Sequence, residues 1–589
     1  MLFSIILAVI NPLYSHAQAS VPTLTSNKNV TVIPGSVIKG NTTGTPKALG
    51  NVSIINLPTA SVSTNLANSK ESPEATAGPN ATALALAKAK SQTSNVTIPK
   101  KQFSLNNLPN LTSTNSTSTN STSTHSTDPP ATASSAIISN SSMPSTSLSF
   151  SLQQANKPIS GFPGLNIQNG GSLHTPTGNL PIYPPDPQIA VGPKIVGEMV
   201  NVGAGFWTKD GQLIKIVPIS RFFNTGTDQI TDPRIMFDNS TGKWFAYLQD
   251  VSNDTVRVAV SNSSDPTTGH FFTFSFPFSG CPDQPSVGLS KDKMIISADI
   301  YSNHCDNSLG QLKGTEFTIV DKSDLLNNRN PPKTFQSKIL PGLYSTHVSK
   351  INNSNETSDL YMAKVGKDGQ LGGKTISVFT ISGEPPNIQL QNSTLSIQQV
   401  DVPLGAAQPG MYSQPIDSYL DSRVQDSSFN QGKLWIAAED RCTPAGDTAH
   451  NCIRLIQIDI PKNTILQDFD ISQANTDLYY PALTIDSSGD LGVFFGYSSK
   501  ILSVYPSLMA VGQFANGTKG ILDYKVPVAT GLSAFPMLRN GDYYGITIDP
   551  SKPKTFWGVG QIIPFPLSDP FGIFWNTFIA NFTIPKAQK

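Results

Sequence analysis

The feature that most constrains this chain is a recurring start to its groups of apolar strands. Seven times, a short turn segment containing Pro, Asp, Ser, Thr or Gly precedes a group of apolar, β-branched runs. The segments are Pro185-Asp186-Pro187, Thr231-Asp232-Pro233, Pro282-Asp283-Gln284-Pro285, Ser345-Thr346-His347, Ser413-Gln414-Pro415, Tyr480-Pro481-Ala482 and Gly541-Asp542-Tyr543. A turn that recurs in this way indicates an architecture built from similar strand groups.

The spacing of these segments is close to, or somewhat longer than, the about 40 to 50 residues of a propeller repeat. Runs such as 244–248 and 491–495 have strand length and are flanked by turn residues. Helical periodicity is limited to one turn at Lys322 to Asn327. We therefore predict an all-β domain over residues 159–589, a β-propeller of seven blades. Six blades are the alternative if one segment divides a blade, and a pair of β-sandwiches if the segments share no axis.

The N-terminus has the pattern of an export signal. Residues 1–10 are almost wholly apolar, and Ala17-Gln18-Ala19 has the small residues that a signal peptidase requires before Ser20. Asn11 and Pro12 end the apolar run well short of the about 20 residues that a membrane span needs. We therefore expect residues 1–19 to be a signal peptide and the mature chain to have no transmembrane segment.

Residues 20–158 differ in composition from the rest of the chain. They are rich in Ser, Thr, Asn, Ala and Pro and poor in aromatic residues, so they cannot bury enough apolar surface to offset the entropy of ordering. This predicts a disordered stalk. Asn-x-Ser/Thr sequons begin at Asn29, Asn41, Asn51, Asn80, Asn95, Asn110, Asn115, Asn120 and Asn140. They indicate either a glycosylated stalk or the chance outcome of such a composition.

The cysteines form two pairs that are local in sequence, Cys281 with Cys305 and Cys442 with Cys452. Four cysteines allow three connectivities, and we predict the local one because each pair brackets a polar stretch between strand-like runs. In an oxidising compartment these would be disulfides. No Cys-x-x-Cys occurs, which argues against structural zinc.

Carboxylates recur in the predicted turn segments. The innermost strands of a propeller surround a central channel, so Asp186, Asp232, Asp283 and Asp542 are expected near one mouth and are the predicted binding residues. Converging carboxylates repel one another unless a hard cation such as Ca²⁺ holds them. The alternative is that each Asp only forms a turn with its own backbone. The sequence leaves open whether a metal ion binds there.

Catalytic candidates are few. Asp542 and Tyr543 could act as a carboxylate and a nucleophile, and Arg234 could hold a substrate carboxylate. Of the arginines, only Arg234 and Arg539 lie close to a turn segment, so a cluster of three would need a loop residue. No Gly-x-Ser-x-Gly nucleophile motif and no His-Glu-x-x-His zinc motif is present. The absence of a specific catalytic spacing favours a noncatalytic function.

Two stretches carry a resemblance to a known group. Residues 232–238 with Gly242-Lys243-Trp244-Phe245, and Gly541-Asp542-Tyr543-Tyr544-Gly545 with Asp549-Pro550 and Phe556-Trp557, resemble secreted sialidase-like and YVTN-like β-propeller proteins of unassigned function. The likeness covers residues 183 to 582. A clean copy of the Asp-box Ser-x-Asp-x-Gly-x-Thr-Trp is absent. The resemblance therefore implies a fold and no particular reaction.

Three functions follow as hypotheses. The first is a secreted, noncatalytic propeller, monomeric and extracellular or at the cell surface, that binds an extracellular glycan or protein. The second is a carbohydrate-active hydrolase or lyase that uses the carboxylates of the channel mouth. The third is a structural component of the cell envelope. Forty basic residues balance forty acidic ones, which excludes the basic footprint of a nucleic-acid-binding protein.

Overall fold

The computed structural model describes residues 33–34, 51–55, 159–167, 172–175, 178–181, 184–305, 310–367, 372–410, 414–418, 422–536, 539–566 and 574–585. The predicted signal peptide lies outside these residues. So does the predicted stalk, except for the strands β1 (Ile33–Pro34) and β2 (Asn51–Ile55). Strand β2 pairs antiparallel with the outer strand of one sheet of the domain.

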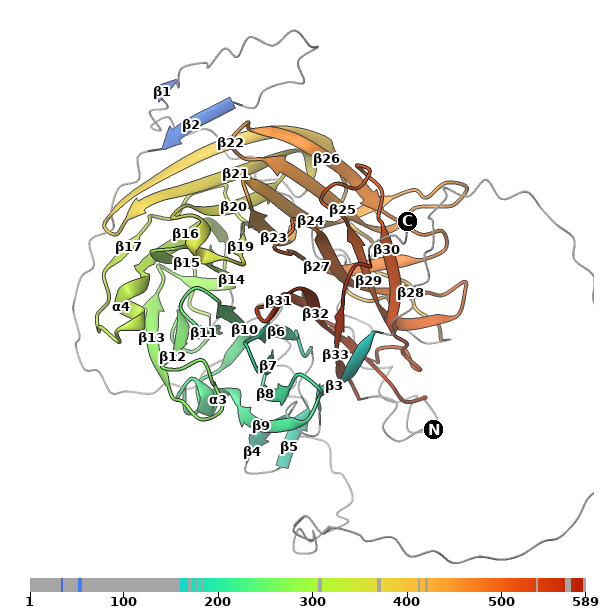
Figure 1. The fold of residues 1–589 in the computed structure, drawn as a ribbon, viewed down its shortest axis with the longest axis horizontal. Helices are drawn as coiled ribbons and strands as arrows, with labels where there is room; N and C mark the ends of the chain where they lie inside the picture. Colours follow the sequence, from blue (N-terminus) through green and yellow to red (C-terminus); the bar gives the residue numbers. More distant parts are fainter. Residues whose placement is uncertain are drawn as a thin grey trace, which may run out of the picture.

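The domain is a ring of seven antiparallel sheets, each of at least four strands (Figure 1). We number the blades in chain order and give the strands of each from the centre outward. Blade 1 is β6 (Gln188–Val191), β7 (Ile195–Val200), β8 (Gly203–Thr208) and β9 (Leu213–Pro218); blade 2 is β10 (Ile230–Asp238), β11 (Lys243–Asp250), β12 (Thr255–Ser261) and β13 (Phe271–Pro277); blade 3 is β14 (Cys281–Leu289), β15 (Lys293–Tyr301), β16 (Leu312–Asp321) and β17 (Thr334–Gln336); blade 4 is β18 (His347–Val348), β20 (Leu360–Val365), β21 (Gly373–Glu384) and β22 (Asn387–Val400). Blade 5 is β23 (Val424–Asn430), β24 (Lys433–Cys442), β25 (His450–Asp459) and β26 (Thr464–Ile471); blade 6 is β27 (Asp477–Ile485), β28 (Leu491–Ser499), β29 (Val504–Gln513) and β30 (Tyr524–Ala529); blade 7 is β31 (Gly545–Asp549), β32 (Lys552–Ile562), β33 (Asn576–Phe582) and β3 (Ser160–Asn166). The all-β, seven-bladed propeller is confirmed, and the six-bladed and sandwich alternatives are excluded.

A strand from the start of the domain completes the last blade. Strand β3 pairs antiparallel with β33, so the seventh sheet contains strands from both ends of the propeller. This pairing closes the ring, because blade 7 would otherwise lack its fourth strand. Strand β19 (Lys350–Ile351) adds to β23, and the hairpin of β4 (Ser172–Thr175) and β5 (Gly178–Pro181) forms a separate small sheet.

Helices are short in the described part of the chain. They are α3 (Ile219–Phe222), α4 (Lys322–Leu326) and the 3₁₀ turn η2 (Ser354–Glu356). The helical turn predicted at Lys322 is therefore present, and the carboxylate of Asp321 caps its first backbone amides. No described helix is both long enough and apolar enough to cross a bilayer.

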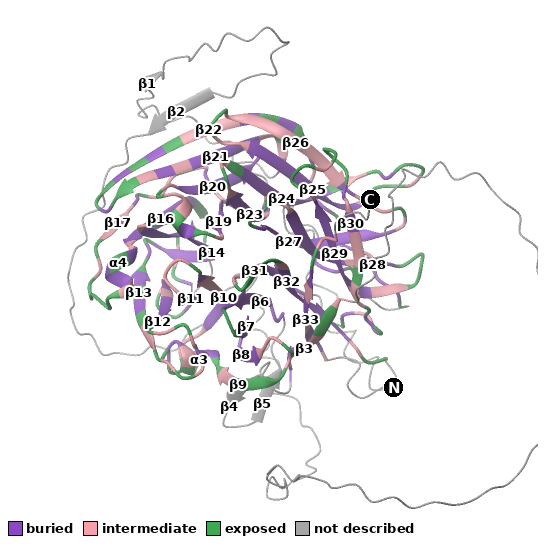
Figure 2. Ribbon diagram, viewed as in Figure 1, coloured by how far each residue is buried: buried purple, intermediate pink, exposed green. Residues whose placement is uncertain are grey.

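The core lies between neighbouring blades. The middle strands are buried on both faces, whereas outer strands such as β9 and β13 expose alternate or successive residues (Figure 2). Blades 6 and 7 show how closely the sheets pack. A Cβ on Gly492 would lie 2.4 Å from Phe556, and one on Gly558 would lie 2.3 Å from Phe494. Each sheet therefore presents a glycine to an aromatic ring of the other.

The recurring turn segments correspond to a shared backbone feature. Asp186, Asp232, Gln284, Ser345 and Tyr480 all have φ between 48° and 54°, and a break in the strand register follows at Asp232, Gln284 and Tyr480. The segments therefore introduce β-bulges that turn the chain into the innermost strand. Asp and Asn tolerate this left-handed conformation better than most residues, which explains the recurrence of Asp.

Two details of the predicted repeat are wrong. Ser413-Gln414-Pro415 does not open blade 5, because the innermost strand β23 begins at Val424, with its own register break before Asp426. In blade 3 the left-handed residue is Gln284, so Asp283 lies one position before the place that Asp232 occupies in blade 2.

Both predicted disulfides are confirmed. Cys281, the first residue of β14, bonds to Cys305, which follows β15. Cys442, the last residue of β24, bonds to Cys452 in the neighbouring strand β25. Each bridge lies within one blade, so the disulfides reinforce single sheets and do not link one blade to another.

A buried acid lies where the ring closes. Glu198 of β7 is fully buried, and its Oε2 accepts a hydrogen bond of 2.8 Å from the backbone N–H of Leu165 in β3. Thr577 of β33 also bonds to this carboxylate. Burial raises the pKa of Glu198 to about 7, and the two hydrogen bonds offset this only in part. Ionised Glu198 therefore weakens the contact between blades 7 and 1.

We predict that Glu198→Gln stabilises the protein at high pH. The pKa is about 7 in the folded state and near 4.5 in the unfolded state, so stability falls as the pH rises from about 4.5 to 7 and does not recover above that. Relative to wild type, the variant should gain up to about 3 kcal/mol between pH 4.5 and pH 8. Denaturant unfolding at the two pH values measures this, and an equal effect at both would contradict it.

Candidate functional site

Three of the four predicted aspartates converge. The carboxylates of Asp186, Asp232 and Asp542 offer oxygens that all lie within 4.8 Å of one another, and the three residues are 0%, 1% and 7% exposed. They come from the turns that open blades 1, 2 and 7. Asp283 does not belong to this group, because its one-residue offset places it opposite Asp299 in the β14–β15 ladder. We call the converging residues the aspartate trio.

Backbone and side-chain hydrogen bonds fix the trio. The backbone N–H of Asp542 donates to Asp186 Oδ1 at 2.8 Å. Asn201, in the turn after β7, donates from Nδ2 to Asp186 Oδ2 at 2.9 Å and accepts at Oδ1 from the backbone N–H of Asp232, also at 2.9 Å. The turns of blades 1, 2 and 7 are thus tied together, and the carboxylates have little freedom to separate.

Arg539 binds two of the buried acids. Its Nη1 lies 2.7 Å from Asp417 Oδ2 and its Nη2 lies 2.5 Å from Asp542 Oδ2. Asp417 also accepts hydrogen bonds from the backbone N–H of Asn540 at 2.9 Å and from the Tyr480 hydroxyl at 2.8 Å. Asp417 was not identified from the sequence, because it follows Ile416 in a connection with no strand pattern.

The three carboxylates have different proton affinities. Burial, together with the charges of Asp542 and Asp232, raises the pKa of Asp186 well above its ordinary value. Burial and the charge of Asp542 raise the pKa of Asp232 to about 7. Burial also acts to raise the pKa of Asp542, but Arg539, Arg423 and Arg234 hold it below its usual value. Asp232 is therefore partly protonated near neutral pH, beside an ionised Asp542.

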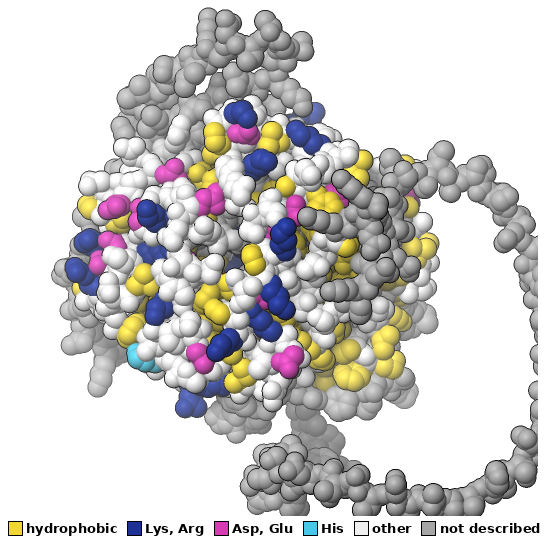
Figure 3. Space-filling model, in the orientation of Figure 1, with side chains coloured by type: hydrophobic (Ala, Val, Ile, Leu, Met, Phe, Trp, Pro, Cys, Tyr) yellow, Lys and Arg dark blue, Asp and Glu magenta, His cyan; other side chains and the backbone are white. Residues whose placement is uncertain are grey.

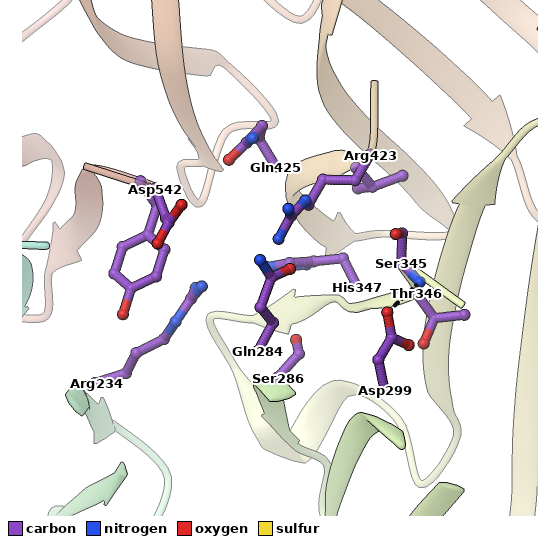
Figure 4. Close-up of a pocket in the computed structure, with 12 residues that line it drawn as sticks. Arg234, Gln284, Ser286, Asp299, Ser345, Thr346, His347, Arg423, Gln425 and Asp542 are labelled. Atoms are coloured by element: carbon purple, nitrogen blue, oxygen red, sulfur yellow. Dashed lines mark hydrogen bonds between the residues drawn. The ribbon is translucent and has the colours of Figure 1, made fainter. Parts of the chain in front are cut away.

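A small cavity of about 30 Å³ lies beside the trio. Figure 4 shows Arg234 and Arg423 extending toward it from opposite sides, with Gln284 and His347 between them and Asp542 at its edge. A cavity of this volume has room for about two water-sized groups. Both arginines come from inner strand starts, Arg234 from β10 and Arg423 from the residue just before β23.

Several buried polar atoms at this cavity have no hydrogen-bond partner within the described residues. They are Nε of Arg234, Nε2 of His347 and the hydroxyl of Tyr543. His347 and Tyr543 are 8% and 6% exposed, so water satisfies them poorly. The Arg234 guanidinium lies 3.9 Å from the centre of the Tyr543 ring, a cation–π contact. Burial and the nearby Arg234 and Lys350 keep the pKa of His347 well below its ordinary value, so its ring is neutral.

The three catalytic candidates from the sequence therefore lie at one cavity. Asp542, Tyr543 and Arg234 all line the cavity, whereas Asp186 and Asp232 lie behind it. Arg423 was missed because the opening of blade 5 was placed about ten residues too early. His347 belongs to a predicted turn segment, but no motif in the sequence marks it as a site residue. Figure 3 shows several Lys and Arg side chains around the middle of the face viewed along the axis.

A scan of the sequence against protein-family models finds no match, and a search of curated proteins finds none. Solved structures do match. An α-L-arabinofuranosidase of Fusarium graminearum is 11% identical with a TM-score of 0.33, covering 72% of this chain and 98% of its own. An α-L-arabinanase of Penicillium chrysogenum is 10% identical with a TM-score of 0.35, covering 73% and 100%. A sialidase of Trypanosoma rangeli is 8% identical with a TM-score of 0.30, covering 72% and 58%. At these values, function has to be argued from the side chains of the site.

We predict that Arg539→Gln strongly destabilises the domain. It would leave Asp417 and Asp542, whose side chains are 1% and 5% exposed, without their shared cation. Removing one partner of a buried ion pair typically costs about 3–5 kcal/mol. Lys462→Gln is the matched control, since Lys462 is 76% exposed in its pair with Asp459 and should contribute less than about 1 kcal/mol. Urea unfolding measures the free energy of unfolding of both variants. Equal decreases in this free energy would contradict a stabilising role for the ion pairs of Arg539.

Proposed function

We propose that this protein is an extracellular glycan-binding propeller whose central cavity takes the carboxylate of an acidic sugar unit. The observation that carries the proposal is the pair of guanidinium groups, Arg234 and Arg423, that face one small cavity from opposite blades. Guanidinium groups bind carboxylates with paired, charge-assisted hydrogen bonds.

Arg234 is the main reason to expect an anionic ligand. Arg539 is paired with two aspartates, but Arg234 forms no ion pair with any described residue and rests on the Tyr543 ring. A half-buried guanidinium is costly to keep unpaired, because a buried polar group without a partner loses its solvation. Asp426 and Asp232 stabilise its charge without a direct hydrogen bond, so a ligand carboxylate would supply the direct partner that the guanidinium lacks.

The other lining groups favour a sugar over a simple anion. Gln284, Gln425, Ser286, Thr346 and His347 offer amide, hydroxyl and imidazole groups that can bond to sugar hydroxyls. The cavity, at about 30 Å³, accommodates a carboxylate but not a sugar ring. The ring would therefore lie outside the cavity, in the mouth of the channel, where the rest of a longer glycan can extend.

The proposal includes an extracellular location. The two disulfides suit an oxidising compartment. The apolar N-terminus and the sequon-rich segment of the sequence point the same way.

Cleavage of a glycosidic bond is a second candidate function. It is favoured by the contrast between Asp542, whose pKa is lowered, and Asp232, whose pKa is about 7, since an acid and a base are often a pair with divergent pKa values. The carboxylate oxygens of the trio lie within 4.8 Å of one another, which is closer than the about 6.5–9.5 Å between the carboxyl groups of inverting glycosidases. Release of reducing sugar from a uronic-acid polysaccharide, lost in Asp542→Asn, would support cleavage. Binding without release would leave recognition as the function.

We predict that Arg234→Gln weakens binding of D-glucuronate by about ten- to hundredfold, since a hydrogen bond to a charged group contributes about 1.5–3 kcal/mol. D-Glucose, which has the hydroxyls but no carboxylate, should bind far more weakly to the wild type. Ligand-observed NMR titration measures both.

Arg329→Gln is the matched control for this test. Its side chain is 63% exposed in an ion pair with Asp324, remote from the cavity, so the substitution removes the same charge without touching the site. Equal affinity for glucose and glucuronate, or equal losses in Arg234→Gln and Arg329→Gln, would count against the proposal.

A further inference from the structure

We infer that carboxylate binding in the central cavity is linked to proton uptake by the aspartate trio, so that the site releases its ligand as the pH rises. This inference rests on the proposed function and adds to it a means of regulation. Its physical basis is that one residue, Asp542, belongs to both the cavity wall and the trio.

Hydrogen bonds hold the aspartate trio close to any negative charge that enters the cavity. Asp542 lines the cavity, and its backbone N–H is bonded to Asp186. Asn201 holds Asp186 and the backbone of Asp232 together behind it. Because these hydrogen bonds hold the three carboxylates close together, a ligand anion in the cavity favours protonation of one of them.

The charged groups around the trio come from several blades. Arg539 faces Asp542 and Asp186, and Asp417 lies on the other side of Arg539. Arg234 and Arg423 act on Asp542 from across the cavity. Asp283 acts on Asp232 from blade 3. The arginines of the cavity are therefore part of what keeps Asp542 ionised.

A ligand carboxylate between Arg234 and Arg423 would change this balance. Its negative charge would partly cancel the field of the two guanidinium groups at Asp542 and would add repulsion of its own. Asp232 would then take a proton from the solvent and become a carboxylic acid, while no bond of the ligand is made or broken. Asp232, whose pKa is about 7, is half protonated near neutrality and fully ionised at higher pH. Above about pH 7, ligand binding therefore requires Asp232 to take up a proton, whereas below about pH 7 Asp232 already holds that proton.

A second observation, independent of the acids, favours ligand binding in this cavity. His347 Nε2 and the Tyr543 hydroxyl are more than nine-tenths buried, line the cavity and have no partner among the described residues. Besides Asp542, two groups of the cavity wall compete as proton acceptors, His347 and Asp299. Burial, together with Arg234 and Lys350, disfavours the charged form of His347. Asp299 accepts hydrogen bonds from the backbone N–H of Ser345 at 2.8 Å and from the Thr315 hydroxyl at 3.0 Å. The test has to separate these two groups from the trio.

Asp232→Asn separates them. Asp232 does not line the cavity, and Asn has the shape of a protonated Asp and tolerates the left-handed φ of 53° at this position. The full-length protein is titrated with D-glucuronate by calorimetry from pH 5.5 to 8.5, and at the higher pH in both HEPES and Tris, whose ionisation enthalpies differ. For wild type we expect the dissociation constant to rise by about tenfold between pH 6.5 and 8.5. We also expect an apparent enthalpy that depends on the buffer at the higher pH.

In Asp232→Asn, the dissociation constant at pH 8.5 should be lower than in wild type. It should change less than about threefold between pH 5.5 and 8.5. Glu198→Gln is the matched control, since Glu198 is buried with a pKa of about 7 but lies at the ring closure. It should keep the wild-type pH dependence. A wild-type affinity that does not vary with pH, or a pH dependence that persists in Asp232→Asn, overturns the linkage but leaves the proposed function intact. No binding at any pH overturns both.

Discussion

The structure depends on closure of the ring. Each blade has two apolar faces, so every sheet needs a neighbour on both sides, and β3 completes the ring by adding the fourth strand to blade 7. The aromatic–glycine contacts between blades 6 and 7 leave no room for a side chain at Gly492 or Gly558. Once the ring is closed, the inner strand starts are forced toward one axis. Polar residues far apart in the sequence thereby become neighbours.

The site is a consequence of how the inner strands begin. A left-handed residue and a bulge direct the chain into the strand, and the residues around the bulge face the channel. Asp suits this conformation, so carboxylates accumulate at the axis and repel one another. Arg539 compensates two of them, and the remaining charge is balanced by protonation. Arg234 and Arg423 then extend beyond the acids into a cavity where they have room for an external anion.

How far the sequence predicted this can be judged from particular residues. Asp186 and Asp232 could be predicted because each occupies a left-handed position next to Pro, and Asp542 because it follows Gly541 in a turn segment. Blade 5 was misplaced because Val424-Gln425-Asp426 opens its strand without Pro or Gly, while Gln414-Pro415 imitates an opening nearby. That error concealed Arg423. Asp417 and the cavity role of His347 could not be predicted, since both depend on contacts between blades. Local cysteine spacing was sufficient for the disulfides because each bridge lies within one blade.

We propose that the central cavity holds a carboxylate between Arg234 and Arg423. The most direct measurement is a crystal structure of the protein grown at about pH 6 with D-glucuronate. We expect electron density for the ligand with its carboxylate oxygens within hydrogen-bond distance of both arginines, its ring outside the cavity, and Asp542 still bound to Arg539. Density for the ligand at another place on the molecule, with the cavity holding only water, would contradict it.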